Sequence, residues 1–137
     1  MAHYTIRELS VRYNIPTSTL RYYEDLGLLT NVTHNEKNQR IYDESHIATL
    51  NAIQCFKQTG LPLSKIKDFF EYSSNLSENI DDVLNMMIEH ETNIKNKIEQ
   101  LQDGLEHIQQ KIRFYSGIQT AIREQKPWPC WEDTLLP

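Results

Sequence analysis

The sequence predicts a mainly α-helical chain in which a winged helix-turn-helix domain is followed by a long dimerisation helix. Three observations carry this prediction. Two short amphipathic segments meet at a proline-containing break over 14–16, a β-prone hairpin follows over 28–42, and an apolar stripe recurs at steps of three and four residues from 80 to 122. We place the first domain at 1–72, the long helix at 78–123 and a tail rich in proline and tryptophan at 124–137.

The helices of the first domain have recognisable ends. Thr5 and Glu8 have the spacing of a capping box, which predicts a helix over about 5–13. A second helix over about 17–26 ends at Gly27, because glycine closes helices in the left-handed conformation. Asp43 is the predicted cap of a third helix over about 44–59, and a fourth helix covers about 63–72. The first two helices and their tight turn form a helix-turn-helix.

Basic and aromatic residues gather on the second helix and at the end of the hairpin. Arg21 lies beside Tyr22 and Tyr23, and the hairpin ends with Arg40-Ile41-Tyr42. Guanidinium and phenol groups donate hydrogen bonds to phosphate oxygens. The first 70 residues carry eight Lys and Arg against seven Asp and Glu, whereas the rest carry six against twelve, so the acidity of the chain lies away from this cluster. We therefore predict a DNA-binding regulator whose second helix enters the major groove.

The apolar stripe of the long helix requires a partner helix. Thirteen heptad core positions fit between 80 and 122, and only Glu91 and Gln119 among them are polar. A helix folded back on the first domain is the alternative, but that domain is too small to cover the stripe, so we predict a homodimer. The predicted dimerisation residues are Ile80, Leu84, Met87, Ile94, Ile98, Leu101, Leu105, Ile108, Ile112, Tyr115 and Ile122.

Glu91 favours an antiparallel pair of helices. A carboxylate in a core position is destabilising unless it meets a cation or an exposed end. In an antiparallel dimer Glu91 would lie toward Tyr115, Gln119 or Arg123 of the second copy.

The tail differs in character from the long helix. Its three prolines exclude a continuous helix, whereas its two tryptophans and two leucines favour burial. We expect the tail to fold back onto the end of the coil or onto the DNA-binding domain of the partner. A disordered terminus is the alternative.

Taken together, these residues resemble the MerR family of bacterial transcription regulators over about 4–122. The resemblance implies a winged helix-turn-helix, an antiparallel coiled-coil dimer, and a promoter with an unusually long spacer that the bound dimer distorts for RNA polymerase. The matching segments are Tyr4-Thr5-Ile6 with Glu8-Leu9, Thr19-Leu20-Arg21-Tyr22-Tyr23-Glu24, Gly27-Leu28-Leu29, Arg40-Ile41-Tyr42, Gly60 and Ile66-Lys67.

The resemblance also implies roles for single residues. Residues predicted to contact the DNA backbone are Arg21, Tyr22 and Arg40, and those predicted to face the groove are Thr17, Ser18 and Thr19. Lys37, Tyr42 and Lys65 complete the predicted DNA-binding set, whereas Leu20 and Tyr23 are expected to pack inside.

Two departures from the family pattern concern local geometry. Asn38-Gln39 stands where the family usually has Gly and Tyr before the wing arginine, and asparagine can take the positive φ that glycine would take there. Pro16 replaces the common capping serine, which leaves Thr17 to cap the second helix.

Cys55 is the predicted sensor residue. The cysteine-rich metal loop and the large ligand-binding domain of other MerR members are missing, and the chain looks like the subgroup that responds to aldehydes and other electrophiles (NmlR- and AdhR-like members), which has a cysteine at this point. On a helix Cys55 projects about 140° from the apolar face marked by Ile47, Leu50 and Ile53. A packing role for Cys55 stays open, and Cys130 is a second redox candidate.

The leading hypothesis is a bacterial, cytoplasmic, nucleoid-associated homodimer that activates transcription and is switched by modification of Cys55. One alternative is the same fold with a small apolar ligand bound non-covalently near the tail, and a more distant one is a coiled-coil module for protein interactions. We expect no enzyme, because no nucleophile–base pair or phosphate-binding glycine loop is present. The two cysteines do not form a metal ligand set, so no metal or cofactor is expected, and no apolar run is long enough for a membrane span.

Overall fold

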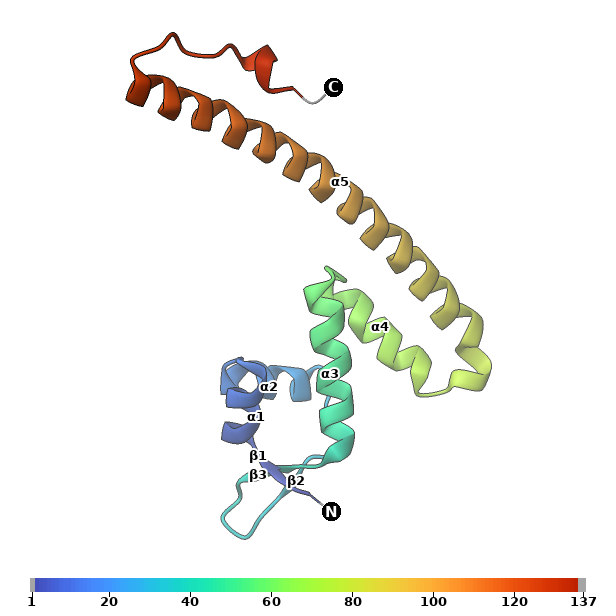
Figure 1. Cartoon of the computed structure of the whole chain (residues 1–137). Helices are drawn as coiled ribbons and strands as arrows, with labels where there is room; N and C mark the ends of the chain where they lie inside the picture. Colours follow the sequence, from blue (N-terminus) through green and yellow to red (C-terminus); the bar gives the residue numbers. More distant parts are fainter. Residues whose placement is uncertain (1, 136–137) are drawn as a thin grey trace. The chain divides into compact units, whose positions relative to one another are not determined.

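The computed structural model describes residues 2–135 and divides into two compact units, Met1–His90 and Glu91–Pro137. The first unit holds five short helical and strand elements followed by two helices, and the long helix α5 (Leu76–Glu124) continues into the second unit (Figure 1). The predicted mainly α-helical class, with a small sheet beside a helix-turn-helix, is confirmed. The first unit extends beyond residue 72 because the start of α5 packs against it.

The helix-turn-helix consists of α1 (Ile6–Tyr13) and α2 (Thr17–Asp25), close to the predicted ranges. The Thr5 hydroxyl accepts a hydrogen bond from the N–H of Glu8 at 3.1 Å, as the capping box predicts. Asn14 ends α1 in the left-handed conformation with φ 53°, and Gly27 follows α2 with φ 80°. Local capping chemistry therefore sets both ends of the motif.

A three-stranded antiparallel sheet forms the wing, in the order β1-β3-β2. The strands are β1 (Tyr4–Thr5), β2 (Thr33–His34) and β3 (Arg40–Tyr42), with Tyr4 opposite Tyr42 and Thr33 opposite Ile41. The hairpin of β2 and β3 was predicted, whereas β1 was not. Asn38 has a φ of 59°, which confirms that asparagine takes the place of glycine in the wing turn.

Helices α3 (Glu44–Gln58) and α4 (Leu63–Ser73) complete the core of the first unit. Asp43 caps α3, as predicted, and hydrogen bonds from the Ser45 hydroxyl and N–H lower the pKa of the Asp43 carboxyl. Gly60 follows α3 with φ 86°. The buried core comprises Leu9, Tyr13, Leu20, Tyr23, Leu28, Leu29, Tyr42, Ile47, Leu50, Ile53, Phe56, Leu61 and Ile66.

The start of α5 belongs to this first core. Met87 packs against the buried cluster, and His90 is buried with its Nε2 2.8 Å from the hydroxyl of Thr59 at the end of α3. Met87 was predicted as a dimerisation residue; in the single chain it is partly buried against the core, and its role in a dimer stays a prediction.

The rest of the predicted dimer stripe is open to solvent in the single chain, apart from a half-buried Ile94. The exposed members are Ile80, Leu84, Ile98, Leu101, Leu105, Ile108, Ile112, Tyr115 and Ile122. A row of large apolar side chains held open over this length is unusual for a soluble monomer.

The tail turns back along the end of α5 within the second unit (Figure 1). A short 3₁₀ helix, Trp131–Thr134, packs its tryptophan edge-on against Phe114, with ring centroids 5.3 Å apart. The Nε–H of Arg113 donates to the carbonyl of Thr134 at 3.0 Å. The predicted return of the tail onto the coil is therefore confirmed for this segment.

Burial of the tail is only partial. Trp128 and Leu135 are exposed, contrary to the expectation that both tryptophans and the leucines are buried, because the contacts to α5 begin at Pro129 and centre on Trp131. Leu136 and Pro137 lie outside the described residues.

Candidate nucleic-acid interface

The second helix of the helix-turn-helix presents a polar face to solvent. Ser18, Arg21 and Tyr22 are exposed, with half of the Tyr22 side chain accessible, whereas Thr17 and Thr19 are half-buried. Leu20 and Tyr23 lie in the core, as predicted. This division places the predicted groove and backbone residues of α2 on the outside of the domain.

The N-terminus of α2 is not capped by a side chain. Pro16 is the capping residue and supplies no side-chain hydrogen bond, so the prediction that Thr17 caps this helix is wrong. Thr17 lies in the first turn, where its hydroxyl accepts a hydrogen bond from the Arg21 guanidinium at 3.4 Å. An uncapped first turn leaves backbone N–H groups and the positive end of the helix dipole available to an anion.

Three arginines line one hollow of about 450 Å³ between α1, α2 and the wing. Arg7 comes from the first turn of α1, Arg21 from α2 and Arg40 from β3, and Asn38 and Gln39 of the wing turn complete the rim. The arrangement gathers guanidinium groups from three segments around a space open to solvent. Such a basic hollow suits phosphate oxygens of a nucleic-acid backbone.

Arg40 is held in place by an ion pair with the recognition helix. Its Nε–H donates to Oε2 of Glu24 at 2.8 Å, and both side chains are partly buried. This hydrogen bond raises the pKa of the Arg40 guanidinium. The contact fixes the wing against α2 and uses one edge of the guanidinium, which leaves the terminal N–H groups for other partners.

The prediction that Tyr42 contacts DNA is wrong. Its side chain is fully buried and packs edge-on against His46, with ring centroids 5.4 Å apart. Burial raises the pKa of the Tyr42 hydroxyl. Tyr42 lies at the end of β3 that leads directly into α3, so the strand carries its side chain into the core instead of toward the wing tip.

Arg7 was missed as a functional candidate. It enters the set because β1 and β3 pair and bring the start of α1 beside the wing, a long-range contact without a local sequence signal. Lys37 lies exposed in the wing turn and Lys65 lies exposed in α4, and neither lines the hollow of the three arginines.

Cys55 lies on the exposed side of α3, as the helical projection predicts. Its carbonyl accepts hydrogen bonds from both the N–H and the hydroxyl of Thr59, at 3.1 and 2.8 Å. The same Thr59 hydroxyl contacts His90, so the backbone of Cys55 is two hydrogen bonds away from the side chain of a residue of α5. Cys130 is exposed as well, and its N–H donates to Oδ2 of Asp133.

Comparison with known proteins decides the family. The sequence model for MerR HTH family regulatory proteins matches residues 4–73, which covers the helix-turn-helix, the wing, α3 and α4. This chain belongs to the MerR family. An uncharacterized HTH-type transcriptional regulator of Haemophilus influenzae is 31% identical over 112 residues, which are 82% of this chain and 83% of that protein.

Solved structures agree with the family assignment along the whole length of this MerR regulator. The crystal structure of HiNmlR, described as a MerR family regulator lacking the sensor domain and bound to promoter DNA, matches with a TM-score of 0.80 and 28% identity over 99% of this chain and 98% of HiNmlR. A MerR family regulator from Bacillus thuringiensis matches with a TM-score of 0.70 and 35% identity over 82% of this chain and 98% of its own. The similarity to HiNmlR supports the predicted NmlR-like subgroup.

Two further properties of residues 2–135 concern membrane spans and metal ligands. No helix in this part of the chain has the length and apolar character that a membrane span requires. No three His, Cys, Asp or Glu side chains within it are grouped as metal ligands. The homologous proteins are transcription regulators and not enzymes.

Proposed function

We propose that this MerR family regulator binds promoter DNA as an antiparallel homodimer, distorts a long promoter spacer so that RNA polymerase can initiate, and is switched by covalent modification of Cys55. The hollow lined by Arg7, Arg21 and Arg40 is the observation that carries the DNA-binding part. It joins the recognition helix to the wing on one surface, and HiNmlR, which shares the fold, is bound to promoter DNA.

The DNA contacts divide into positioning and reading. Arg7, Arg21, Tyr22 and Arg40 carry donors for phosphate oxygens, and the uncapped first turn of α2 adds backbone N–H groups. Thr17, Ser18 and Thr19 occupy that first turn, which is the part of a recognition helix that reaches base edges in the major groove. Lys37 at the wing and Lys65 on α4 supply further cations at exposed positions.

Dimerisation supplies a second recognition helix, which binds the second half-site of the promoter. The open apolar stripe of α5 needs a helix of similar length, and a second copy of the same stripe satisfies that need. Glu91 is exposed and pairs only loosely with Lys95 at 3.4 Å, so it remains available to a cation or a hydroxyl of an antiparallel partner.

The thiol switch rests on where Cys55 lies. The side chain is open to reagents, and its backbone carbonyl is linked through Thr59 to His90 of α5. In the reaction with an aldehyde the sulfur forms a bond to the carbonyl carbon, the C=O π electrons move to oxygen, and that oxygen takes the proton lost by the thiol. The product is a hemithioacetal at the end of α3, and a bias of a few kcal/mol between two dimer states is enough to change promoter geometry.

Transcription from the target promoter with purified polymerase tests the switch. We expect aldehyde to change transcription for the wild type and for Cys130→Ser, and to have no effect on Cys55→Ser. Equal responses of all three proteins contradict the switch, and a response lost only in Cys130→Ser moves it to the tail.

DNA affinity tests the interface separately from the switch. Arg21→Ala and Arg7→Ala should each weaken promoter binding about tenfold and reduce its salt dependence, because each removes a phosphate contact. Lys126→Ala removes an exposed cation just beyond α5 and is the matched control. If the three variants bind alike, the hollow is not the DNA-binding surface.

A further inference from the structure

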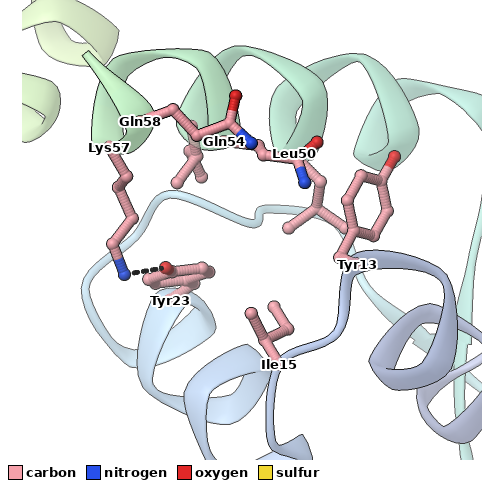
Figure 2. A pocket seen from close by; sticks show the side chains of 8 residues that line it. Tyr13, Ile15, Tyr23, Leu50, Gln54, Lys57 and Gln58 are labelled. Carbon is pink, nitrogen blue, oxygen red and sulfur yellow. Dashed lines mark hydrogen bonds between the residues drawn. The ribbon is translucent and has the colours of Figure 1, made fainter. Parts of the chain in front are cut away.

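An apolar pocket, open to solvent along the edge of α3, lies between α1, α2 and α3 (Figure 2). Its volume is about 170 Å³, and the apolar part of its wall consists of Tyr13, Ile15, Tyr23, Leu50 and Ile53. A cavity of about 150 Å³ is large enough to hold benzene. The pocket therefore has room for one six-membered ring with a small substituent.

The walls of the pocket are held by the core of the domain. Tyr23, Leu50 and Ile53 are each about 2% exposed. The hydroxyl of Tyr13 donates to Oδ1 of Asn51 on α3 at 2.8 Å, which keeps the flat ring of Tyr13 at the side of the pocket. These wall residues therefore belong to the packed core of the domain.

One end of the pocket is polar and carries a positive charge. The ammonium of Lys57 donates to the hydroxyl oxygen of Tyr23 at 3.0 Å, as Figure 2 shows, and no carboxylate among residues 2–135 forms an ion pair with Lys57. The Tyr23 hydroxyl acts there as an acceptor, so its own proton is available for donation. The side-chain amides of Gln54 and Gln58 lie along the same edge of α3.

We propose that this pocket is a binding site for a small aromatic monocarboxylate. The ring lies among Ile15, Leu50 and Ile53, and the carboxylate accepts hydrogen bonds from the Lys57 ammonium and the Tyr23 hydroxyl. Two donors 3.0 Å apart suit the two oxygens of one carboxylate, and charge-assisted hydrogen bonds of this type are the strong ones. Charge complementarity selects an anion over a neutral or cationic ligand of the same shape.

The site is distinct from the proposed thiol switch. Cys55 does not line the pocket, and carboxylates do not react with thiols under ordinary conditions. Because Tyr23 belongs to the recognition helix and Lys57 to α3, an occupied pocket ties these two helices together. Ligand binding can be measured without DNA, so a failure here does not depend on the DNA-binding or switching parts of the proposed function.

Methyl NMR of the full-length protein, titrated with benzoate, tests the proposal. A ligand of this size should bind with a Kd of about 0.1–1 mM and shift the methyl signals of Ile15, Leu50 and Ile53. Benzyl alcohol has the same ring with a neutral head and should bind at least tenfold more weakly. Lys57→Met should weaken benzoate binding at least tenfold and leave benzyl alcohol unchanged, whereas Lys67→Met, which removes an exposed cation from α4, should have no effect.

A second variant fills the space itself. Ile15→Phe places a ring in the pocket and should abolish the binding of both compounds. If this variant does not fold, the Lys57→Met result alone decides. The proposal is overturned if benzoate at about 20 mM leaves the three methyl signals unmoved, if benzoate shifts only signals outside the pocket, or if Lys57→Met and Lys67→Met bind benzoate equally.

Discussion

Leu101→Ala should weaken the proposed dimer strongly. Leu101 is the most exposed residue of the α5 stripe, with 73% of its surface accessible in the single chain. The substitution removes three carbons, each worth about 0.8 kcal/mol when buried, and scaling by the accessible fraction gives about 1.8 kcal/mol per chain. Both chains of a dimer carry the change, so the loss is about 3.5 kcal/mol, or an increase of about 300-fold in the dimer Kd.

Sedimentation equilibrium over a wide concentration range measures this change directly. Asn96→Ala is the matched control, because Asn96 is also exposed on α5 but lies on the side of the helix opposite the stripe. The control should leave the dimer Kd within about threefold of the wild type. If Leu101→Ala stays within the same range, the stripe is not the dimer interface and the partner of α5 must be sought elsewhere.

Three other variants test separate contacts. Gly117→Ala should shift tryptophan emission to the red, because a Cβ at Gly117 would lie 2.9 Å from the ring of Pro129 and push the tail off α5. A Cβ at Gly104 would meet nothing within 4 Å, so Gly104→Ala should leave the emission unchanged. Glu24→Gln should lower the free energy of unfolding in urea by about 1 kcal/mol, because it removes the negative charge that faces Arg40 of the wing. Asp25→Asn, at the exposed neighbouring position, should change it by less than half as much. The pKa of Asp43 is lower in the folded than in the unfolded chain, so the stabilisation by its carboxylate is present above the unfolded pKa of about 3.9 and is lost as the pH falls through the folded pKa. The difference in free energy of unfolding between the wild type and Asp43→Asn should therefore shrink on acidification below about pH 4. A difference that stays constant with pH would contradict the role of the charge.

The helix ends could be predicted from the sequence because the interactions that set them are local. Thr5, Asp43 and Gly27 act on backbone groups within one turn, so residue type and spacing are sufficient to place them. The exposure of Cys55 followed from the same reasoning, since the projection of a residue around a helix depends only on its distance from the apolar positions.

Features that depend on distant partners were missed or assigned wrongly. The pairing of β1 with β3 joins segments almost forty residues apart, and this pairing brings Arg7 to the wing and fixes Tyr4 opposite Tyr42. Arg40 and Tyr42 are two positions apart on the same face of one strand, yet Arg40 is partly open beside Glu24 and Tyr42 is closed off by His46. The packing of α3 against the sheet decides this difference, and nothing in the three residues of β3 reveals it.

The contact between the tail and α5 limits how many helices can gather around the end of this chain. Phe114 and Gly117, which hold the tail, lie about 100° or more around the helix from the stripe residues Ile112 and Tyr115. Trp131 and Pro129 cover that flank, whereas Ile112, Tyr115 and Ile122 of the stripe stay exposed. We therefore expect this end of α5 to accept one partner helix, which favours a pair over a three- or four-stranded bundle.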